Sequence, residues 1–166
     1  MSKREVVLAL GSNIGNRLAY LRSAAEELSN CGFRIIKKSG VWETKPWGVE
    51  NQPSFLNMCL IAASELEAEE MLDAAKSIEK KLGRKKSLRW GPREIDIDII
   101  MMGKNGEEIF TSDNLTVPHP LMHERDFVMT PLAEIAPDFI HPLIGKSVAS
   151  IANELTSRNM NRITEL

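Results

Sequence analysis

Isoleucine and aspartate alternate over residues 95–99, and this alternation constrains the fold more than any other feature of the chain. In a strand, successive side chains point to opposite faces, so the isoleucines share one face while Asp96 and Asp98 share the other. The segment therefore predicts a strand with one buried face and one acidic face. The two carboxylates should stand roughly 6.5–7 Å apart along this strand.

A basic segment precedes the predicted strand. Residues 80–93 hold seven Lys or Arg and no Asp or Glu. Aspartate is uncommon in strands and like charges on one face repel, so Asp96 and Asp98 cost stability unless a cation binds there. Carboxylates bind Mg²⁺ and arginine binds phosphate, so the combination predicts a site for a metal–polyphosphate complex. The alternative is a solvated strand face whose aspartates pair with nearby Lys and Arg.

Length and composition set the broad class of protein. The chain has 166 residues, which predicts one domain over 1–166 with a core that needs no disulfide. Its net charge of −2 argues against a dedicated nucleic-acid binder. Cys31 and Cys59 are expected to be reduced core residues, and no Cys–His spacing suggests zinc. Without a signal-like apolar segment or an apolar run of ~18 residues, a cytoplasmic location is expected.

Apolar periodicity predicts strands and helices in the order β-α-β-β-α-β. The strands are expected over residues 6–10, 33–43, 55–63 and 95–101, and the helices from the cap Asn16 to the stop Gly32 and from Glu67 to Leu82. This order favours the α+β class, with a ferredoxin-like βαββαβ core in which an antiparallel sheet carries helices on one face. Asn105-Gly106 predicts a hairpin turn, and a helix near 148–155 completes a C-terminal hairpin and helical extension.

The glycine-containing segment 11–16 follows a strand and precedes a helix, as a phosphate-binding loop would. It lacks the Gly-Lys-Ser/Thr ending of a Walker loop and the third glycine of a dinucleotide fingerprint. A tight turn with an Asn cap is the favoured interpretation, so the segment should shape a site indirectly.

The basic loop has three possible roles, as a solvated charge run, a nucleic-acid patch or a phosphate clamp. Its arginines Arg84, Arg89 and Arg93 can each make two parallel contacts to phosphate oxygens. The adjoining aspartates favour the clamp, and Gly83 would serve as the hinge of a lid.

His119 and two phenylalanines form a third group of candidates. His119 lies between Pro118 and Pro120 and reads either as a packed loop residue or as a donor to a phosphate or nucleotide. Phe55 and Phe127 would ordinarily belong to the core. Because Phe55 is close to Asn57 in the sequence, a planar heterocycle could instead stack on the ring and bond the amide.

Four segments together resemble the 6-hydroxymethyl-7,8-dihydropterin pyrophosphokinase family of folate biosynthesis. They are residues 8–13, 55–57, 89–98 and 117–127. The pattern Trp-Gly-Pro-Arg-x-x-Asp-x-Asp over 90–98 is the most specific of them. Lys86 stands where other members can carry a further arginine, the loop is a residue shorter than in some relatives, and Pro120 stands where some members have an aromatic residue. These departures leave the role of Lys86 open.

The resemblance implies a role for each matching residue. Asp96 and Asp98 would bind two Mg²⁺ ions, and Arg84 and Arg93 would act on the transferred group. The residues in or near the ATP site would be Glu79, Arg84, Arg89, Trp90, Arg93, Ile99, Thr116, His119 and Arg125. Those around the pterin would be Thr44, Pro46, Trp47, Phe55, Asn57 and Phe127.

The activity implied is transfer of pyrophosphate from ATP to the hydroxymethyl-dihydropterin by a monomer, without nucleic acid or membrane partners. Two alternatives remain. A ferredoxin-like RNA-binding module would bind RNA in a salt-dependent way without Mg²⁺. A regulatory domain of the same topology would bind a metabolite without releasing AMP.

Overall fold

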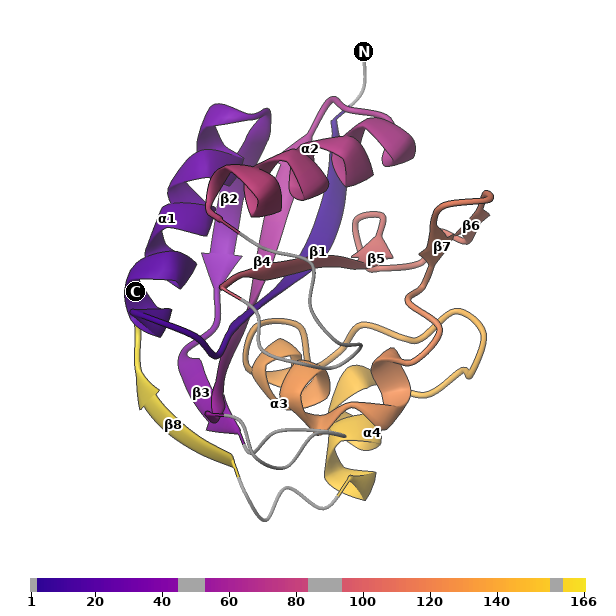
Figure 1. Cartoon of the computed structure of the whole chain (residues 1–166). Helices are drawn as coiled ribbons and strands as arrows, with labels where there is room; N and C mark the ends of the chain where they lie inside the picture. Colours follow the sequence, from indigo (N-terminus) through magenta and orange to yellow (C-terminus); the bar gives the residue numbers. More distant parts are fainter. Residues whose placement is uncertain (1–2, 45–52, 84–93, 156–159) are drawn as a thin grey trace.

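The computed structural model describes residues 3–44, 53–83, 94–155 and 160–166. Within these residues the chain forms an antiparallel sheet with helices packed on both of its faces (Figure 1). In chain order the elements are β1 (Arg4–Ser12), α1 (Arg17–Asn30), β2 (Phe33–Lys38), β3 (Val41–Thr44), β4 (Phe55–Ser64), α2 (Ala68–Lys81), β5 (Asp96–Met102), β6 (Phe110–Thr111), β7 (Thr116–Val117), the 3-10 helix η1 (Met122–Glu124), α3 (Asp126–Ile135), α4 (Val148–Glu154) and β8 (Met160–Thr164).

The strand order of the main sheet is β5-β1-β4-β3-β8, and β2 also pairs with β4. Each of these pairs is antiparallel. The predicted α+β class with an antiparallel sheet is therefore confirmed, and the order of strands and helices through β5 matches the prediction except for one additional strand. A separate two-stranded sheet joins β6 to β7.

The prediction of one strand over 33–43 was wrong, because the structure divides this segment into β2 and β3. Lys38 pairs with Leu60 and Trp42 pairs with Asn57, so this side holds one more residue than β4 does over the same interval. The buried Ser39 stabilises the break, since its Oγ accepts a hydrogen bond of 2.9 Å from the backbone N of Cys59. At the extra residue, the side-chain oxygen of Ser39 therefore takes the place of the backbone carbonyl oxygen that would accept this bond in a regular sheet.

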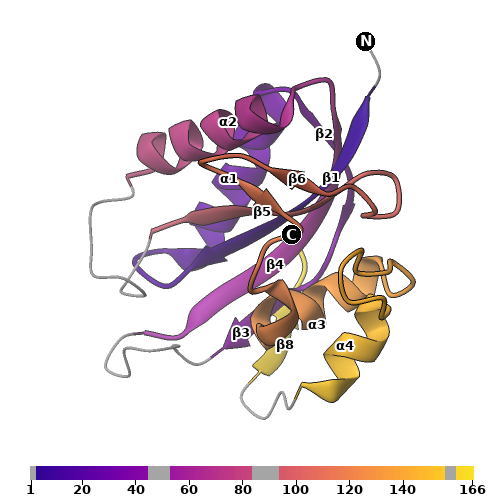
Figure 2. The same cartoon turned by 90° about the vertical axis from the view of Figure 1, so that its right-hand side faces the viewer.

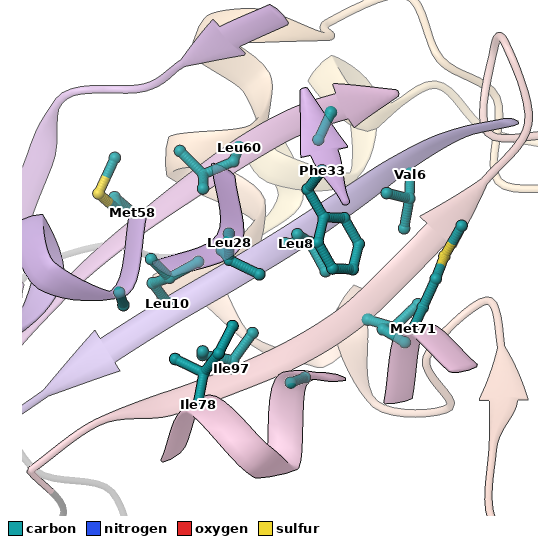
Figure 3. Packing of buried hydrophobic residues seen from close by; sticks show 14 of the residues in the cluster. Val6, Leu8, Leu10, Leu28, Phe33, Met58, Leu60, Met71, Ile78 and Ile97 are labelled. Carbon is teal, nitrogen blue, oxygen red and sulfur yellow. The ribbon is translucent and has the colours of Figure 1, made fainter. Parts of the chain in front are cut away.

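The larger core lies between the sheet and helices α1 and α2. Figure 3 shows Leu8, Leu10 and Leu60 of the sheet facing Leu28 of α1 and Ile78 of α2. Both helices begin as the sequence predicts. Asn16 Oδ1 accepts from Ala19 N at 3.1 Å, and a reciprocal Glu67–Glu70 capping box opens α2. Both helices are followed by a glycine with positive φ, at 97° for Gly32 and 96° for Gly83.

A second core lies on the opposite face, where α3 and α4 pack (Figure 2). Cys59, Ile61 and Met101 of the sheet meet Val128 and Leu132 of α3 there. The expectation of helices on one face therefore holds for α1 and α2, while the C-terminal extension covers the other face. Cys59 is buried, Cys31 is half-buried, and both are free thiols.

Asn105-Gly106 was expected to form a hairpin turn, and the structure has the turn but pairs no two of the described strands across it. A turn is present, because Gly106 N donates to Gly103 O, and the returning chain makes one further bond from Glu108 N to Met102 O. The chain then leaves β5. The two-stranded hairpin forms later, between β6 and β7. Among the described residues, no helix combines the length and apolar character that crossing a membrane requires.

Candidate active site

The register of three strands brings the aspartates and Asn57 onto one face of the sheet. Asp96 of β5 pairs with Gly11 of β1, which in turn pairs with Asn57 of β4. Asp98 pairs with Ala9, two residues away from Gly11 along β1. Cross-strand partners share a face, so the carboxylates and the amide flank a central strand that carries almost no side chain here. This is the face on which α3 packs, because Ala9 contacts the second core.

The alternation predicted for β5 is confirmed. Ile97 and Ile99 are buried in the core beneath α1 and α2, while Asp96 and Asp98 are half-buried on the other face. The side chain of Ile99 therefore points away from the aspartates. A nucleotide could meet Ile99 on this face only through its backbone.

Gly11 permits a close approach of the Asn57 carboxamide. A Cβ placed on Gly11 would lie 2.8 Å from Asn57 Oδ1 and 3.7 Å from Cδ1 of Phe55. On its other side, Asn57 Nδ2 donates to Thr44 Oγ1 at 2.8 Å. The structure thus brings together Thr44, Phe55 and Asn57, three of the residues predicted around a planar ligand, and it fixes the orientation of the amide.

The carboxylates of Asp96 and Asp98 are suited to an Mg²⁺ ion that also binds a nucleotide. In the part of the chain that the structure describes, no group of three or more His, Cys, Asp or Glu side chains could hold a metal ion. Mg²⁺ bound with a polyphosphate takes one or two protein carboxylates and completes its octahedron with phosphate oxygens and water. The pair Asp96 and Asp98 therefore fits an ion brought in with a nucleotide, and does not fit a resident all-protein site.

Glu79 of α2 bonds the backbone of β5 at Ile97, the residue between the two aspartates. It is 7% exposed, and its Oε2 accepts a hydrogen bond of 2.7 Å from Ile97 N. The resemblance places this residue near the nucleotide, whereas the contact recorded here is with the peptide between the two aspartates.

His119 is held against β5 from outside the sheet. Its backbone N donates to Ile100 O at 2.9 Å, and its Nδ1 accepts from Leu121 N at 3.1 Å. Because Nδ1 is an acceptor, the proton of the neutral ring sits on Nε2. Burial first, and then the charge of Arg125, lower the pKa of His119 to about 4. At neutral pH His119 is an uncharged Nε2–H donor.

Arg125 and Phe127 stand together where α3 begins. The Arg125 Cζ lies 5.6 Å from the centroid of the Phe127 ring, within the range of a cation–π contact. The Arg125 Nε is buried without a hydrogen-bond partner among the described atoms. Thr116, the other predicted nucleotide residue in this part of the chain, is exposed at the start of β7.

Six of the predicted site residues fall outside the described residues. They are Pro46, Trp47, Arg84, Arg89, Trp90 and Arg93, and Lys86 joins them.

The β1–α1 loop and the first residue of α1 make contacts that the sequence did not predict. Asn13 Nδ2 donates to Pro53 O at 3.0 Å, and Arg17 Nη1 donates to Ser54 O and to Glu43 Oε2, both at 2.8 Å. These bonds tie the loop to the residues just before Phe55. That this loop shapes the site indirectly stays a prediction. In the sequence, only the cap position of Asn16 pointed to this loop.

The pKa of His119 gives a first testable prediction. In an NMR titration, the His119 ring should titrate near pH 4, well below the ordinary value of about 6.5. Between these two values the unfolded chain binds a proton that the folded chain does not, so the free energy of unfolding should fall as the pH is lowered from about 6.5 to about 4. In the variant His119→Gln, the free energy of unfolding should fall less over this pH range, because the contribution of His119 is removed. A wild-type midpoint near 6.5 would contradict the assigned environment.

Comparison with known proteins decides the family. A sequence model described as "7,8-dihydro-6-hydroxymethylpterin-pyrophosphokinase (HPPK)" matches residues 7–137. The chain belongs to this family. A 2-amino-4-hydroxy-6-hydroxymethyldihydropteridine pyrophosphokinase of Aquifex aeolicus is 44% identical over 151 residues, which are 91% of this chain and 92% of that protein. The protein of the same name from Bacillus subtilis is 44% identical over 129 residues, or 77% of this chain and 75% of its own.

Solved HPPK structures share the fold. The wild-type HPPK-DHPS of Plasmodium falciparum with pteroate matches 98% of this chain at a TM-score of 0.78 and 14% identity. This chain spans about half the length of that protein, 48% of it. At this identity the likeness shows the fold alone. The predicted family and the predicted enzyme class, a pyrophosphokinase, are confirmed by the sequence relatives.

Proposed function

We propose that this HPPK-family chain transfers the pyrophosphoryl group of ATP to 6-hydroxymethyl-7,8-dihydropterin, giving the pterin diphosphate and AMP in folate biosynthesis. One observation supports this more than any other. Asp96 and Asp98 share a sheet face with Asn57 and Phe55, separated only by Gly11 and Ala9 of β1. A ring bound at the amide could therefore present a substituent to a polyphosphate held at the aspartates.

The pterin would bind in a slot between Phe55 and Phe127, with the backbone of Thr44, Pro46 and Trp47 along its edge. A fixed Asn57 amide offers a paired donor and acceptor, and hydrogen bonding of this kind rejects flat rings that lack the matching groups. The Gly11 contact and the Thr44 bond support this role, because they hold the carboxamide in one orientation.

The ATP polyphosphate would bind between β5 and the basic segment. Asp96 and Asp98 would hold two Mg²⁺ ions, which when bound polarise the β-phosphoryl oxygens and lower the proton affinity of the attacking hydroxyl. His119 would donate its Nε2–H to the nucleotide, and Arg125 would supply a guanidinium nearby. The further ATP contacts proposed are Arg84, Arg89, Trp90, Arg93, Ile99 and Thr116, and Glu79 would lie near the nucleotide while its carboxylate bonds the backbone of Ile97.

The reaction is an in-line displacement at the β-phosphorus. The hydroxymethyl oxygen forms a bond to this atom while the bond to the α,β-bridging oxygen breaks, and AMP leaves with the electron pair. The hydroxyl proton passes to solvent, and the sequence requires no separate general base. Arg84 and Arg93 would offset the negative charge that develops as AMP departs.

The finer structural and cellular predictions belong to the same proposal. The strand order β5-β1-β4 followed by β2 and β3 supports a ferredoxin-like core. We further propose a single pyrophosphokinase domain over 1–166 that acts as a monomer in the cytoplasm on small-molecule substrates.

The decisive experiment is incubation with ATP, Mg²⁺ and 6-hydroxymethyl-7,8-dihydropterin, followed by separation of the nucleotides. AMP should form only when the pterin is present, and ADP should not form. ADP as the product would refute pyrophosphoryl transfer. Absence of turnover combined with salt-dependent RNA binding in the absence of Mg²⁺ would favour the RNA-binding alternative.

The ring slot gives a second testable prediction. Phe55→Ala should weaken pterin binding roughly 10–100-fold, because stacking of a base on an aromatic ring contributes about 1–3 kcal/mol. Fluorescence titration with the pterin measures this directly. The matched control is Phe110→Ala, since Phe110 is also half-buried but packs against the core between the sheet and helices α1 and α2. Unchanged affinity in Phe55→Ala would return Phe55 to a purely structural role.

A further inference from the structure

The strand that carries the aspartates lies at the edge of the sheet, and its outer side is bonded by residues that do not belong to the sheet. In the described strand order β5 has β1 on one side only. On the other side Ile97 N donates to Glu79 Oε2 at 2.7 Å, and Ile100 O accepts from His119 N at 2.9 Å. Ile100 is the extra residue of a bulge, because Ile99 pairs with Leu8 and Met101 with Val7.

The bond to Glu79 falls at the peptide that separates the two aspartates. Successive residues of a strand direct their backbone groups to opposite sides. Since Ile97 N points outward, the backbone groups of Asp96 and Asp98 point toward β1, opposite Gly11 and Ala9. The three consecutive residues are therefore fixed from both sides, and Glu79 supplies the outer contact.

Glu79 occupies an unfavourable position for a carboxylate. It is 7% exposed, and it lies in the last turn of α2, where the helix dipole disfavours negative charge. A buried charge is costly unless it is well bonded, and a carboxylate that accepts from a backbone N–H makes one of the stronger hydrogen bonds in proteins. The neighbouring residue Ile78 is an apolar side chain buried in the larger core, so packing in this turn does not require a carboxylate. A carboxylate here therefore serves something other than packing.

We propose that Glu79 is a positioning residue for the metal ligands: its carboxylate fixes the Ile97 peptide and thereby sets the directions in which Asp96 and Asp98 present their oxygens. This inference rests on the proposed function, in which the two aspartates bind a divalent cation. Residues that orient metal ligands typically change metal affinity 10–100-fold when they are replaced.

The test compares Glu79→Ala, Glu79→Gln and the control Glu69→Gln, an exposed glutamate in the first turn of the same helix. The first measurement is NMR hydrogen exchange of the Ile97 amide without metal or nucleotide. Exchange should be at least about tenfold faster in Glu79→Ala, intermediate in Glu79→Gln because the amide oxygen still accepts, and unchanged in the control. Unchanged exchange in Glu79→Ala would overturn the proposal.

The second measurement is Mn²⁺ binding by electron paramagnetic resonance, with α,β-methylene-ATP as a nucleotide that cannot transfer its pyrophosphoryl group. Mn²⁺ affinity should fall about 10–100-fold in Glu79→Ala and recover in part in Glu79→Gln, while pterin affinity stays unchanged. Faster exchange with unaltered Mn²⁺ affinity would make Glu79 merely structural and would refute positioning. A loss of affinity for the metal-free nucleotide would instead indicate direct contact with ATP and would also refute it.

Failure of the proposed function can be distinguished from failure of the role proposed for Glu79. In that case the wild-type protein itself would neither bind Mn²⁺ with the nucleotide analogue nor form AMP. A wild type that does both, beside a Glu79→Ala variant that binds Mn²⁺ equally well, would reject only the role of Glu79. If Glu79→Ala does not fold, Glu79→Gln carries both measurements.

Discussion

Replacing Asp98 by alanine is expected to lower kcat for AMP formation by about 10³-fold or more, and Asp96→Ala should have an effect of the same order. Both carboxylates share the face opposite Gly11 and Ala9, so each would contribute to the same metal–polyphosphate complex. Loss of one leaves that complex with too few protein ligands. Rapid-quench measurement of AMP under single-turnover conditions isolates this effect from product release.

Asp113→Ala is the matched control, because Asp113 is an exposed aspartate in the turn between β6 and β7. It should retain the wild-type rate. Pterin binding in the absence of metal should also survive in Asp98→Ala, since the Asn57–Thr44 bond lies two strands away. A near-normal rate in either aspartate variant would remove the metal assignment.

Arg93→Ala is expected to reduce kcat by about 10²–10³-fold while changing the affinity for ATP far less. Its guanidinium is proposed to stabilise charge that appears only as AMP departs, so its loss should raise the barrier rather than weaken the ground state. Stopped-flow binding of ATP and single-turnover AMP formation, measured on the same variant, separate the two quantities.

Two further variants sharpen the test of Arg93. Arg93→Lys keeps the charge but loses the planar pair of donors, so it should recover only part of the rate. Lys86→Ala removes a charge from the same basic segment and should change kcat much less. If Arg93→Ala raised only KM, the transition-state role would be refuted.

Features that depend on neighbouring residues could be predicted from the sequence. The alternation around Asp96 and Asp98 is confirmed because one buried face fixes the direction of every side chain on a strand. The cap at Asn16 and the stops at Gly32 and Gly83 are local hydrogen-bonding and backbone effects, and they too are found as predicted.

Features that depend on distant residues could not be predicted. Helix α3 was missed because Pro131 lies inside it, and a proline normally ends a helical pattern; here the packing of Val128 and Leu132 against the sheet maintains the helix. The break between β2 and β3 depends on a bond between Ser39 and Cys59, twenty residues apart. Strand β8 is largely exposed, and it pairs with β3 while Arg162 bonds Glu134 of α3.

The same limit applies to the candidate site. The sequence identified Asn57 as a candidate ligand, but not the glycine whose missing side chain admits its amide. It also placed Glu79 near the nucleotide by resemblance, without the contact to Ile97. Cross-strand register decides the first and the packing of α2 against β5 decides the second, and the pattern within one segment contains neither.

The small residues Ala9 and Gly11 of β1 have a consequence for inhibitor design. A compound joining a flat ring over Phe55 to an anionic arm bound through Mg²⁺ at Asp96 and Asp98 would cross β1 at Gly11 and Ala9, whose own side chains occupy almost no space. Resistance by enlarging Gly11 would place a carbon 2.8 Å from Asn57 Oδ1 and would displace the amide proposed to bind the natural substrate. An organism that escaped such a drug by this route would impair its own enzyme.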